Sequence, residues 1–168
     1  QIGDYKFEQS QHFAFHTGRC ARITIDDEVI GYAGEIHPDV LENYEISKKT
    51  YLAELNLDTI LSKASRKIVF KPLPKFPASD RDLAIVVKER ILADDIISTI
   101  KEIGGELLEK VELFDVYQGS QIAKGYKSMA FSLIFRAEDR TLTDKEVNDI
   151  IEKIQTGLYE KFDATLRK

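Results

Sequence analysis

The stretch from Leu113 to Phe135, LFDVYQGSQIAKGYKSMAFSLIF, constrains the fold of this chain most. It holds two apolar segments in which large side chains recur at every second position, separated by a loop that contains Gly119 and Gly125. This pattern predicts two strands joined by a hairpin-type connection. Because successive side chains of a strand point to opposite faces, one face of the pair is bulky and apolar and the other is small and polar.

The alternation predicts which side chains share a face. On the second strand, the large apolar face is formed by Met129, Phe131, Leu133 and Phe135. The opposite face of that strand is formed by Ser128, Ala130, Ser132 and Ile134. On the first strand, strict alternation separates Phe114 and Val116 from Leu113, Asp115 and Tyr117. A small polar face with one aromatic ring can lie flat against a nucleotide base, although many two-layer domains carry a polar outer face without a binding role.

The segments around this strand pair complete a ferredoxin-like order of elements. A strand is expected over 83–87 and an amphipathic helix over 93–105, with Gly104 or Gly105 at its end. Thr143 and Glu146 match a capping box at the start of a second helix, and a short strand is expected over 163–167. Strand, helix, strand, strand, helix, strand is the split βαβ sandwich, an α+β fold, here over 81–168. Both apolar helices should cover one face of its four-stranded antiparallel sheet. The uncovered face would then present Ala84, Asp115, Tyr117, Ser128, Ala130 and Ser132.

The N-terminal residues 1–68 predict a piece of a second domain. Residues 1–12 carry little pattern and are expected to form a loose end. A hairpin follows over 21–37, in which Gly31 and Gly34 suggest close backbone approach. Pro38 can open a short helix, a strand follows over 50–57, and Asp58 stands where an N-cap belongs. These few strands and short helices are typical of the C-terminal portion of a larger α/β domain.

A proline-rich linker over 69–80 separates the two parts. Pro72, Pro74 and Pro77 cannot continue a helix or a central strand, and each pushes the residue before it toward extended geometry. We therefore predict that residues 69–80 are an extended, stiff connection between residues 1–68 and residues 81–168.

Length and composition limit the class of protein. The 168 residues have room for one domain plus a substantial piece of another, and no apolar run approaches the roughly 18 residues that span a bilayer. No signal peptide opens the chain, and the single Cys20 agrees with a reducing compartment. We therefore expect a cytoplasmic protein. Because the first residue is Gln1 and not Met, we also expect a fragment of something longer.

The net charge of −5 excludes a general electrostatic attraction to nucleic acid. If RNA is the partner, the contacts must be local and specific. Six basic side chains are candidates for phosphate contacts, with Arg81, Lys124 and Lys127 foremost and Lys71, Lys75 and Arg136 beside them.

The chain carries no convincing catalytic or metal-binding motif. His12 and His16 are four residues apart but lack the glutamate and third ligand of a zinc protease site. Cys20 has no CxxC partner, and Ser120 lacks the second glycine of a nucleophile elbow. His37, which precedes Pro38, fits a capping or surface role better than a catalytic one. We therefore expect no catalytic residue, metal site or cofactor in this chain itself.

Several segments resemble one family in order and spacing. FPASDRDLAIVV, LFDVYQG, GYKSMAFSLIF, RTLTDKEV and DATLR resemble the ferredoxin-fold anticodon-binding domain that ends the β subunit of bacterial phenylalanyl-tRNA synthetases. Upstream, AFHTGRCARI, VIGYAGEIHPDVLENYEI and YLAELNLDTIL are similar to the last part of the synthetase-like core domain of that subunit.

The resemblance implies a part of the enzyme that joins phenylalanine to its tRNA as an (αβ)₂ heterotetramer. In that family the α subunit carries the catalytic site for ATP, magnesium and phenylalanine, and the terminal domain of the β subunit grips the anticodon stem-loop of the tRNA. The family's anticodon contacts correspond here to Asp115 and Tyr117 of FDVY, Ser128 of GYKS and Ala84 of RDLA. We expect Tyr117 to stack on a base, Asp115 and Ser128 to hydrogen-bond to base edges or ribose, and Ala84 to keep the surface flat.

Two other functions remain open at this point. Ferredoxin-like sheets also form regulatory modules that sense small molecules, although the turn KERILAD after the first strand is charged and lacks the glycines such modules use. The domain could also serve only assembly. If the chain binds RNA by itself, its acidic charge predicts a weak affinity, with a Kd above about 10⁻⁵ M at physiological salt.

Overall fold

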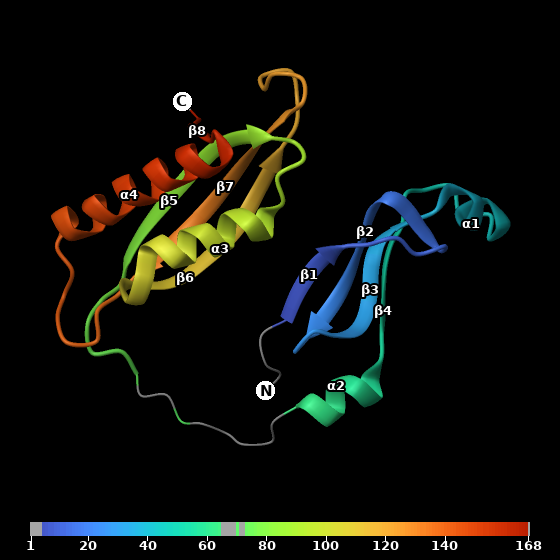
Figure 1. The fold of residues 1–168 in the computed structure, drawn as a ribbon, viewed down its shortest axis with the longest axis horizontal. Coiled ribbons are helices and arrows are strands. Elements are labelled where there is room, and N and C mark those ends of the chain that lie inside the picture. Colours follow the sequence, from blue (N-terminus) through green and yellow to red (C-terminus); the bar gives the residue numbers. More distant parts are fainter. Residues whose placement is uncertain (1–4, 65–69, 71–72, 168) are drawn as a thin grey trace. The chain divides into compact units, whose positions relative to one another are not determined.

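The computed structural model describes residues 5–64, 70 and 73–167 (Figure 1). The chain divides into two compact units, Gln1–Lys71 and Pro72–Lys168. Each unit contains one four-stranded sheet in which all pairs are antiparallel, and this confirms the predicted α+β class. Within the described residues, no helix combines the length and the apolar character that a bilayer span requires. Part of the predicted linker 69–80 lies outside the described residues, so its bounds stay a prediction.

The N-terminal unit is a meander of four strands in chain order, β1-β2-β3-β4. Its elements are β1 (Tyr5–Gln9), β2 (Phe15–Ile25), β3 (Glu28–Ile36), α1 (Pro38–Asn43), β4 (Tyr51–Leu55) and α2 (Leu57–Lys63). The expectation of a loose end is wrong for residues 5–9, because pairing with residues 21–25 of β2 satisfies the backbone of β1. Residues 1–4 lie outside the described part. The described strands of this unit all pair antiparallel, and its place in a larger α/β domain stays a prediction.

The predicted hairpin of the N-terminal unit is confirmed. Asp26 and Asp27 connect β2 to β3 with φ values of 51° and 63°, the left-handed conformations of a tight hairpin turn. A Cβ at Gly31 would overlap the Glu54 carbonyl oxygen of β4, so the predicted close backbone approach is present there. The predicted N-cap is wrong by two residues, because Asn56 Oδ1 and not Asp58 accepts the Thr59 N–H, at 3.1 Å.

The C-terminal unit has the predicted βαββαβ order. Its elements are β5 (Ser79–Lys88), α3 (Ala93–Gly104), a 3₁₀ turn η1 (Gly105–Leu107), β6 (Leu108–Tyr117), β7 (Tyr126–Phe135), α4 (Asp144–Phe162) and β8 (Thr165–Leu166). The sheet order is β6-β7-β5-β8, so the two long hydrogen-bonded partners β5 and β7 form its centre.

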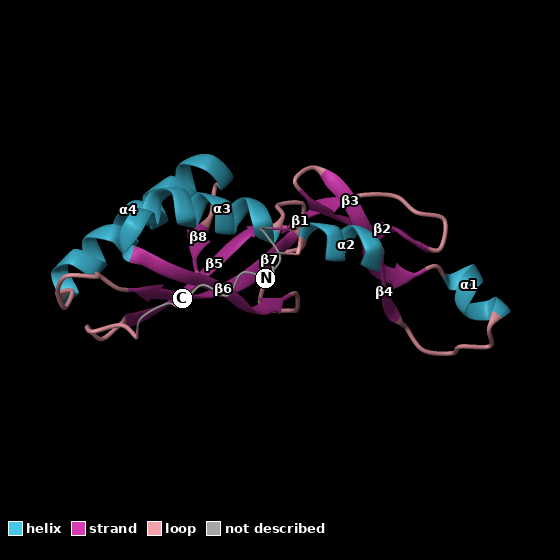
Figure 2. Cartoon of the chain, turned by 90° about the horizontal axis from the view of Figure 1, so that it is seen from below, coloured by secondary structure: helices cyan, strands magenta, loops and turns pink. Residues whose placement is uncertain are grey.

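Both helices cover one face of this sheet (Figure 2). Ile96 and Ile100 of α3, and Ile154 and Leu158 of α4, are fully buried against the sheet. Their partners from the strands include Leu83, Ile85, Val87, Met129, Phe131, Leu133 and Phe135. Each such aliphatic side chain contributes roughly 1.5–3 kcal/mol when fully buried, so neither helix could stay undocked. The hydrophobic core therefore lies entirely on the helix side.

Helix α4 begins at the predicted capping box. The Thr143 Oγ1 accepts the Glu146 N–H at 3.3 Å, and the Glu146 carboxylate accepts the Thr143 N–H at 2.9 Å. The backbone N–H of Thr143, the Arg140 guanidinium and the Thr143 hydroxyl hold the pKa of Glu146 at about 2. The helix ends at Asp163, whose φ of 57° turns the chain into β8.

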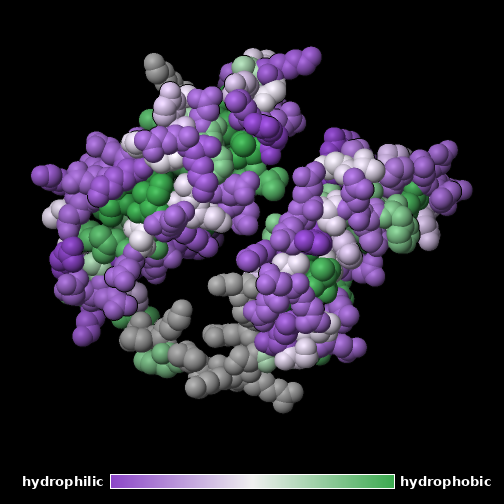
Figure 3. All heavy atoms as spheres, in the orientation of Figure 1, coloured by the Kyte–Doolittle hydropathy of each residue, from purple (hydrophilic) through white to green (hydrophobic). Residues whose placement is uncertain are grey.

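In each unit, hydrophilic side chains dominate the visible surface, and smaller hydrophobic patches lie among these side chains (Figure 3). In the N-terminal unit the buried core is small. It consists of two clusters, Phe15, Cys20 and Ile36 in one and Ile23, Ile25 and Ile30 in the other.

Candidate nucleic-acid interface

The face of the second sheet opposite α3 and α4 is called the open face, formed by alternate residues of β5, β6 and β7 and by β8. Cross-strand pairing arranges its side chains in rows. Ala84, Ala130 and Asp115 form one row across β5, β7 and β6. The next row consists of Val86, Ser128 and Tyr117. The structure thus brings the four predicted contact residues together on one surface, within two neighbouring rows.

A β-bulge decides which side chains of β6 reach the open face. Leu113 pairs with Phe131, but Asp115 pairs with Ala130, so the register shifts by one residue at Phe114. Leu113 therefore packs on the helix-side core, while Asp115 and Tyr117 point to the opposite face. The strict alternation that grouped Leu113 with Asp115 and Tyr117 is wrong, because the extra residue in β6 inverts the side-chain phase.

Tyr117 is half-buried and held between two neighbours. The guanidinium carbon of Arg167 lies 5.2 Å from the centroid of the Tyr117 ring, in a cation–π contact. A Cβ at Gly119, in the loop after β6, would overlap the Tyr117 hydroxyl. The ring is therefore held in place by its surroundings. Less side-chain conformational entropy is then lost when a base stacks on it.

Arg167 also covers Ser128. The Arg167 Nη1 donates to the Ser128 Oγ at 3.4 Å, and the Arg167 backbone N–H donates to the Ala84 carbonyl at 2.9 Å. Ser128 is only 2% exposed, so the serine expected on an accessible surface is covered in this conformation. The small side chain of Ala84 leaves room for the arginine to cross β5. Sequence reasoning did not single out Arg167, and its only sequence signal is a basic residue in the terminal DATLR segment.

Asp115 is exposed at the edge of the open face. Among residues 5–64, 70 and 73–167, no hydrogen bond or ion pair engages its carboxylate. A carboxylate of this kind presents two acceptor oxygens, which suit the paired N–H donors of a base edge.

The foremost candidates for phosphate contacts are spread over different surfaces. Arg81 shares the phase of Leu83 and donates to Asp144 Oδ1 at 2.6 Å, so it lies on the helix side. Lys127 pairs with Val87 and also lies on the helix side; burial lowers its pKa, and the Glu89 carboxylate acts in the opposite direction. Lys124 is exposed in the loop between β6 and β7. Of these three, Arg81 and Lys127 therefore lie on the helix side, and Lys124 is exposed in the loop at the end of β6.

Of the remaining phosphate candidates, Arg136 is bound to Glu109 and to the Phe76 carbonyl, and Lys75 is exposed. Lys71 lies outside the described residues.

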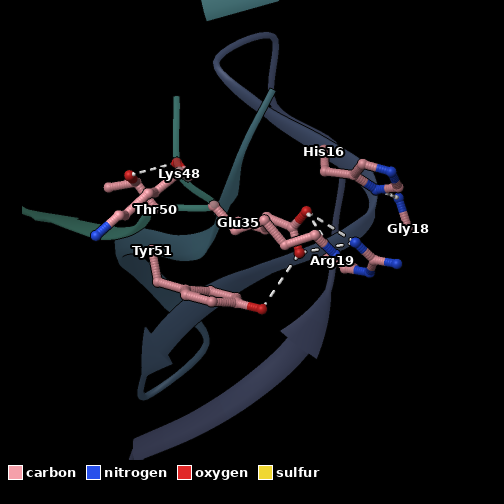
Figure 4. A network of polar contacts seen from close by, with 8 residues as sticks. His16, Gly18, Arg19, Glu35, Lys48, Thr50 and Tyr51 are labelled. Carbon is pink, nitrogen blue, oxygen red and sulfur yellow. Dashed lines mark hydrogen bonds and ion pairs between the residues drawn. The ribbon is translucent and has the colours of Figure 1, made fainter. Parts of the chain in front are cut away.

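In the N-terminal unit, the buried carboxylate of Glu35 is bound by neighbouring side chains (Figure 4). The Arg19 Nη1 donates to both oxygens of Glu35 at 2.8 and 2.7 Å, and the Tyr51 hydroxyl donates to Glu35 Oε2 at 3.3 Å. Burial acts to raise the pKa of Glu35, but Arg19, Lys49 and Tyr51 together hold it below its ordinary value. This network ties β2, β3 and β4 together.

The histidines of the N-terminal unit have structural roles. The His37 Nδ1 accepts the Asp39 N–H at 3.3 Å and caps α1, as predicted. His12 packs against the rings of Phe13, Phe15 and Tyr32. Within the described part of the chain, no group of three His, Cys, Asp or Glu side chains is arranged to hold a metal ion.

Two family descriptions match the chain, one in each unit. "Phenylalanyl tRNA synthetase beta chain CLM domain" matches residues 1–57, and "Ferredoxin-fold anticodon binding domain" matches residues 74–167. The order of these matches confirms the resemblance found in the sequence motifs.

Curated relatives named phenylalanine–tRNA ligase beta subunit align over nearly the whole chain. The protein of Clostridium tetani is 50% identical over 163 residues, which is 97% of this chain and 20% of that protein. The proteins of Moorella thermoacetica and Symbiobacterium thermophilum are 43% and 40% identical, over 100% and 94% of this chain and 21% and 18% of their own lengths. The chain thus spans about a fifth of these relatives. Because the anticodon-binding description covers more than half of the chain and the second unit has the ferredoxin-like strand order, the chain belongs to the ferredoxin-fold anticodon-binding domain family.

Proposed function

We propose that the open face of the C-terminal unit binds the anticodon stem-loop of a tRNA for phenylalanine. The observation that carries the proposal is the joint position of Asp115, Tyr117 and Arg167 on the one sheet face that the helices leave uncovered. An aromatic ring, a carboxylate acceptor and a cation are the groups that recognise unstacked bases and their backbone in single-stranded RNA.

Tyr117 is the stacking residue in this proposal. One side of its ring is occupied by the Arg167 guanidinium, whose hydrogen bond to Ser128 is long, at 3.4 Å. An incoming base takes the place of the guanidinium on the ring, and Arg167 turns outward to pair with a phosphate. This movement uncovers the Ser128 hydroxyl, which then hydrogen-bonds to the base or ribose. Displacing the Arg167 guanidinium costs little free energy because Arg167 is exposed and both of its side-chain contacts are weak.

The remaining contacts follow from position. The exposed Asp115 carboxylate accepts a hydrogen bond from the edge of a base. The small side chain of Ala84, in the same row, allows the RNA to approach the sheet closely. Lys124 is the phosphate contact in the β6–β7 loop. Arg81 and Lys127 are not included, since both lie on the helix side of the sheet.

The activity of the longer protein is also part of the proposal. The 40–50% identity to phenylalanine–tRNA ligase beta subunits supports a role in phenylalanylation of tRNA, within an (αβ)₂ assembly in the cytoplasm. The α subunit performs the chemistry with ATP and magnesium, and this chain holds the distal end of the tRNA. The charged β5–α3 turn and the aromatic ring of Tyr117 on the open face favour this function over a small-molecule sensor.

Titration of the chain with a labelled anticodon stem-loop tests the proposal, with free phenylalanine and the α subunit as competing ligands. Tyr117→Ala should weaken RNA binding about 5- to 150-fold, the effect of losing one base stack. Tyr159→Ala is the matched control, because this tyrosine is exposed on α4, on the helix side of the sheet. Equal affinity of Tyr117→Ala and the unmodified chain would remove Tyr117 from the interface.

A further inference from the structure

A second tyrosine lies on the open face beside the proposed site. Tyr126, the first residue of β7, has the side-chain phase of Ser128 and Ala130 and is half-buried. Because Tyr117 pairs with Ser128, two residues farther along β7, the two tyrosines are diagonal neighbours on one face. Diagonal pairs of this kind lie about 7–8 Å apart, within reach of aromatic side chains. The open face thus carries a second tyrosine ring besides Tyr117, which sequence reasoning did not consider.

The backbone of Tyr126 is fixed by a turn and by β5. Its N–H donates to the Ala123 carbonyl at 3.0 Å, and the preceding Gly125 has a φ of 86°, which favours glycine. The Gly125 carbonyl accepts the Glu89 N–H at 2.9 Å. The ring is therefore presented from a defined strand start rather than from a free loop. It contributes nothing to the helix-side core, which lies on the other face.

Lys88 stands directly opposite Tyr126, on β5. Its Nζ is 3.9 Å from Asp163 Oδ2, and both side chains are partly exposed, so this ion pair is wide and weak. The charge on the open face changes sign along β5, from Asp80 and Asp82 at its start to Lys88 at its end. A polyanion on this face is therefore favoured at the end where the two tyrosines lie.

We infer that Tyr126 and Lys88 form a second nucleotide subsite for single-stranded RNA, next to the one on Tyr117. The Tyr126 ring stacks on the neighbouring base, and the Lys88 ammonium pairs with a backbone phosphate. This inference rests on the proposed function, since it assigns a second loop nucleotide to the same surface. Two rings at diagonal spacing suit two bases that are both splayed out of their stack.

The test measures binding of the anticodon stem-loop to the chain with Tyr126→Ala or Lys88→Ala. Tyr126→Ala should weaken binding about 5- to 150-fold, and Tyr126→Phe should preserve it because stacking needs only the ring. Lys88→Ala should reduce the slope of log K against log salt by about 0.7, the contribution of one phosphate in a single strand. Tyr159→Ala and Lys145→Ala are the matched controls, because both side chains are exposed on α4, on the helix side.

A fluorescent adenine analogue placed at successive loop positions separates the two subsites. Tyr117→Ala should restore the quenched fluorescence at one position and Tyr126→Ala at the adjacent position. If Tyr117→Ala weakens binding while Tyr126→Ala behaves like Tyr159→Ala, the second subsite is overturned and the proposed function stands. If the unmodified chain binds no stem-loop, both are overturned. Circular dichroism establishes that each variant is folded, and Tyr126→Leu provides an apolar replacement if the alanine variant unfolds.

Discussion

Gly119 lies directly against the phenol of Tyr117, so that a Cβ at this glycine would overlap the tyrosine hydroxyl. The loop after β6 therefore determines the position of the ring that the site depends on. This contact connects a turn residue with no chemistry of its own to the proposed binding of a base.

Gly119→Ala should weaken RNA binding without unfolding the domain. The new methyl group displaces the end of the Tyr117 side chain, which can rotate away at small cost to the fold. We expect roughly tenfold weaker binding, within the range of one lost stack. Gly105→Ala is the control: its φ of 60° makes the substitution cost about 1–3 kcal/mol of stability, but a Cβ there meets nothing and the site is distant. Stronger RNA binding by Gly119→Ala would contradict the proposed role of the ring position.

Arg167→Ala should lower the salt dependence of RNA binding, since one cation no longer meets a phosphate. The slope of log K against log salt is expected to fall by about 0.7, the contribution of one phosphate in a single strand. Arg167→Lys retains the charge but not the planar group, so it should keep the salt slope and lose part of the affinity. Lys101→Ala, which removes an exposed cation from α3, should change neither quantity. An unchanged slope for Arg167→Ala would show that its guanidinium meets no phosphate.

The stability of the C-terminal unit should fall with pH below 4.5. The pKa of Glu146 is about 2 in the folded chain, below its ordinary value of 4.5, because the Thr143 N–H, Arg140 and the Thr143 hydroxyl bind its charged form. A depressed pKa contributes stability above the unfolded value, and that stability is lost as the pH falls from 4.5 toward 2. Thermal unfolding across this pH range measures the effect.

Glu146→Gln should lower the melting temperature at neutral pH and flatten its dependence on pH between 4.5 and 2. Glu138→Gln, in the same connection between β7 and α4, should leave the wild-type curve unchanged. Identical pH profiles for Glu146→Gln and the unmodified chain would exclude the capping box as the titrating element.

Arg19→Ala should destabilise the N-terminal unit more than Arg22→Ala does. Removing Arg19 leaves the buried Glu35 carboxylate without the nitrogen that donates to both of its oxygens, whereas Arg22 pairs with the exposed Glu8. Exposed pairs of the second kind contribute less than about 1 kcal/mol. Hydrogen exchange of the β2 and β3 amides measures the difference within this unit. Combining Arg19→Met with Glu35→Leu should recover stability, and equal exchange in the two alanine variants would refute the structural role of the network.

Local patterns predicted most of the elements correctly. The alternation of Met129, Phe131, Leu133 and Phe135 identified the core face of β7, and Thr143 with Glu146 identified the start of α4. These features depend on residues within about four positions of one another, so a single sequence contains the information.

Features that depend on pairing between distant segments were not predictable in the same way. Residues 5–9 show no clear pattern, and they form a strand only because β2 offers its edge. The bulge at Phe114 is also invisible in the sequence, where the alternation through β6 looks continuous. It becomes apparent only from the pairing with β7, in which Leu113 is opposite Phe131 in the core and Asp115 is opposite Ala130 on the open face.

For this protein the sequence by itself determined the βαββαβ order and the capping of α4, and it predicted four of the residues that we propose to contact RNA. Only the tertiary structure decided that Leu113 packs under the helices while Asp115 and Tyr117 stay on the open face, that Arg167 covers Tyr117 and Ser128, and that Tyr126 joins them. The physical reason is that side-chain direction in a sheet follows the register between strands. Register is set by packing between residues that are far apart in the sequence, so the periodicity within one segment does not reveal it.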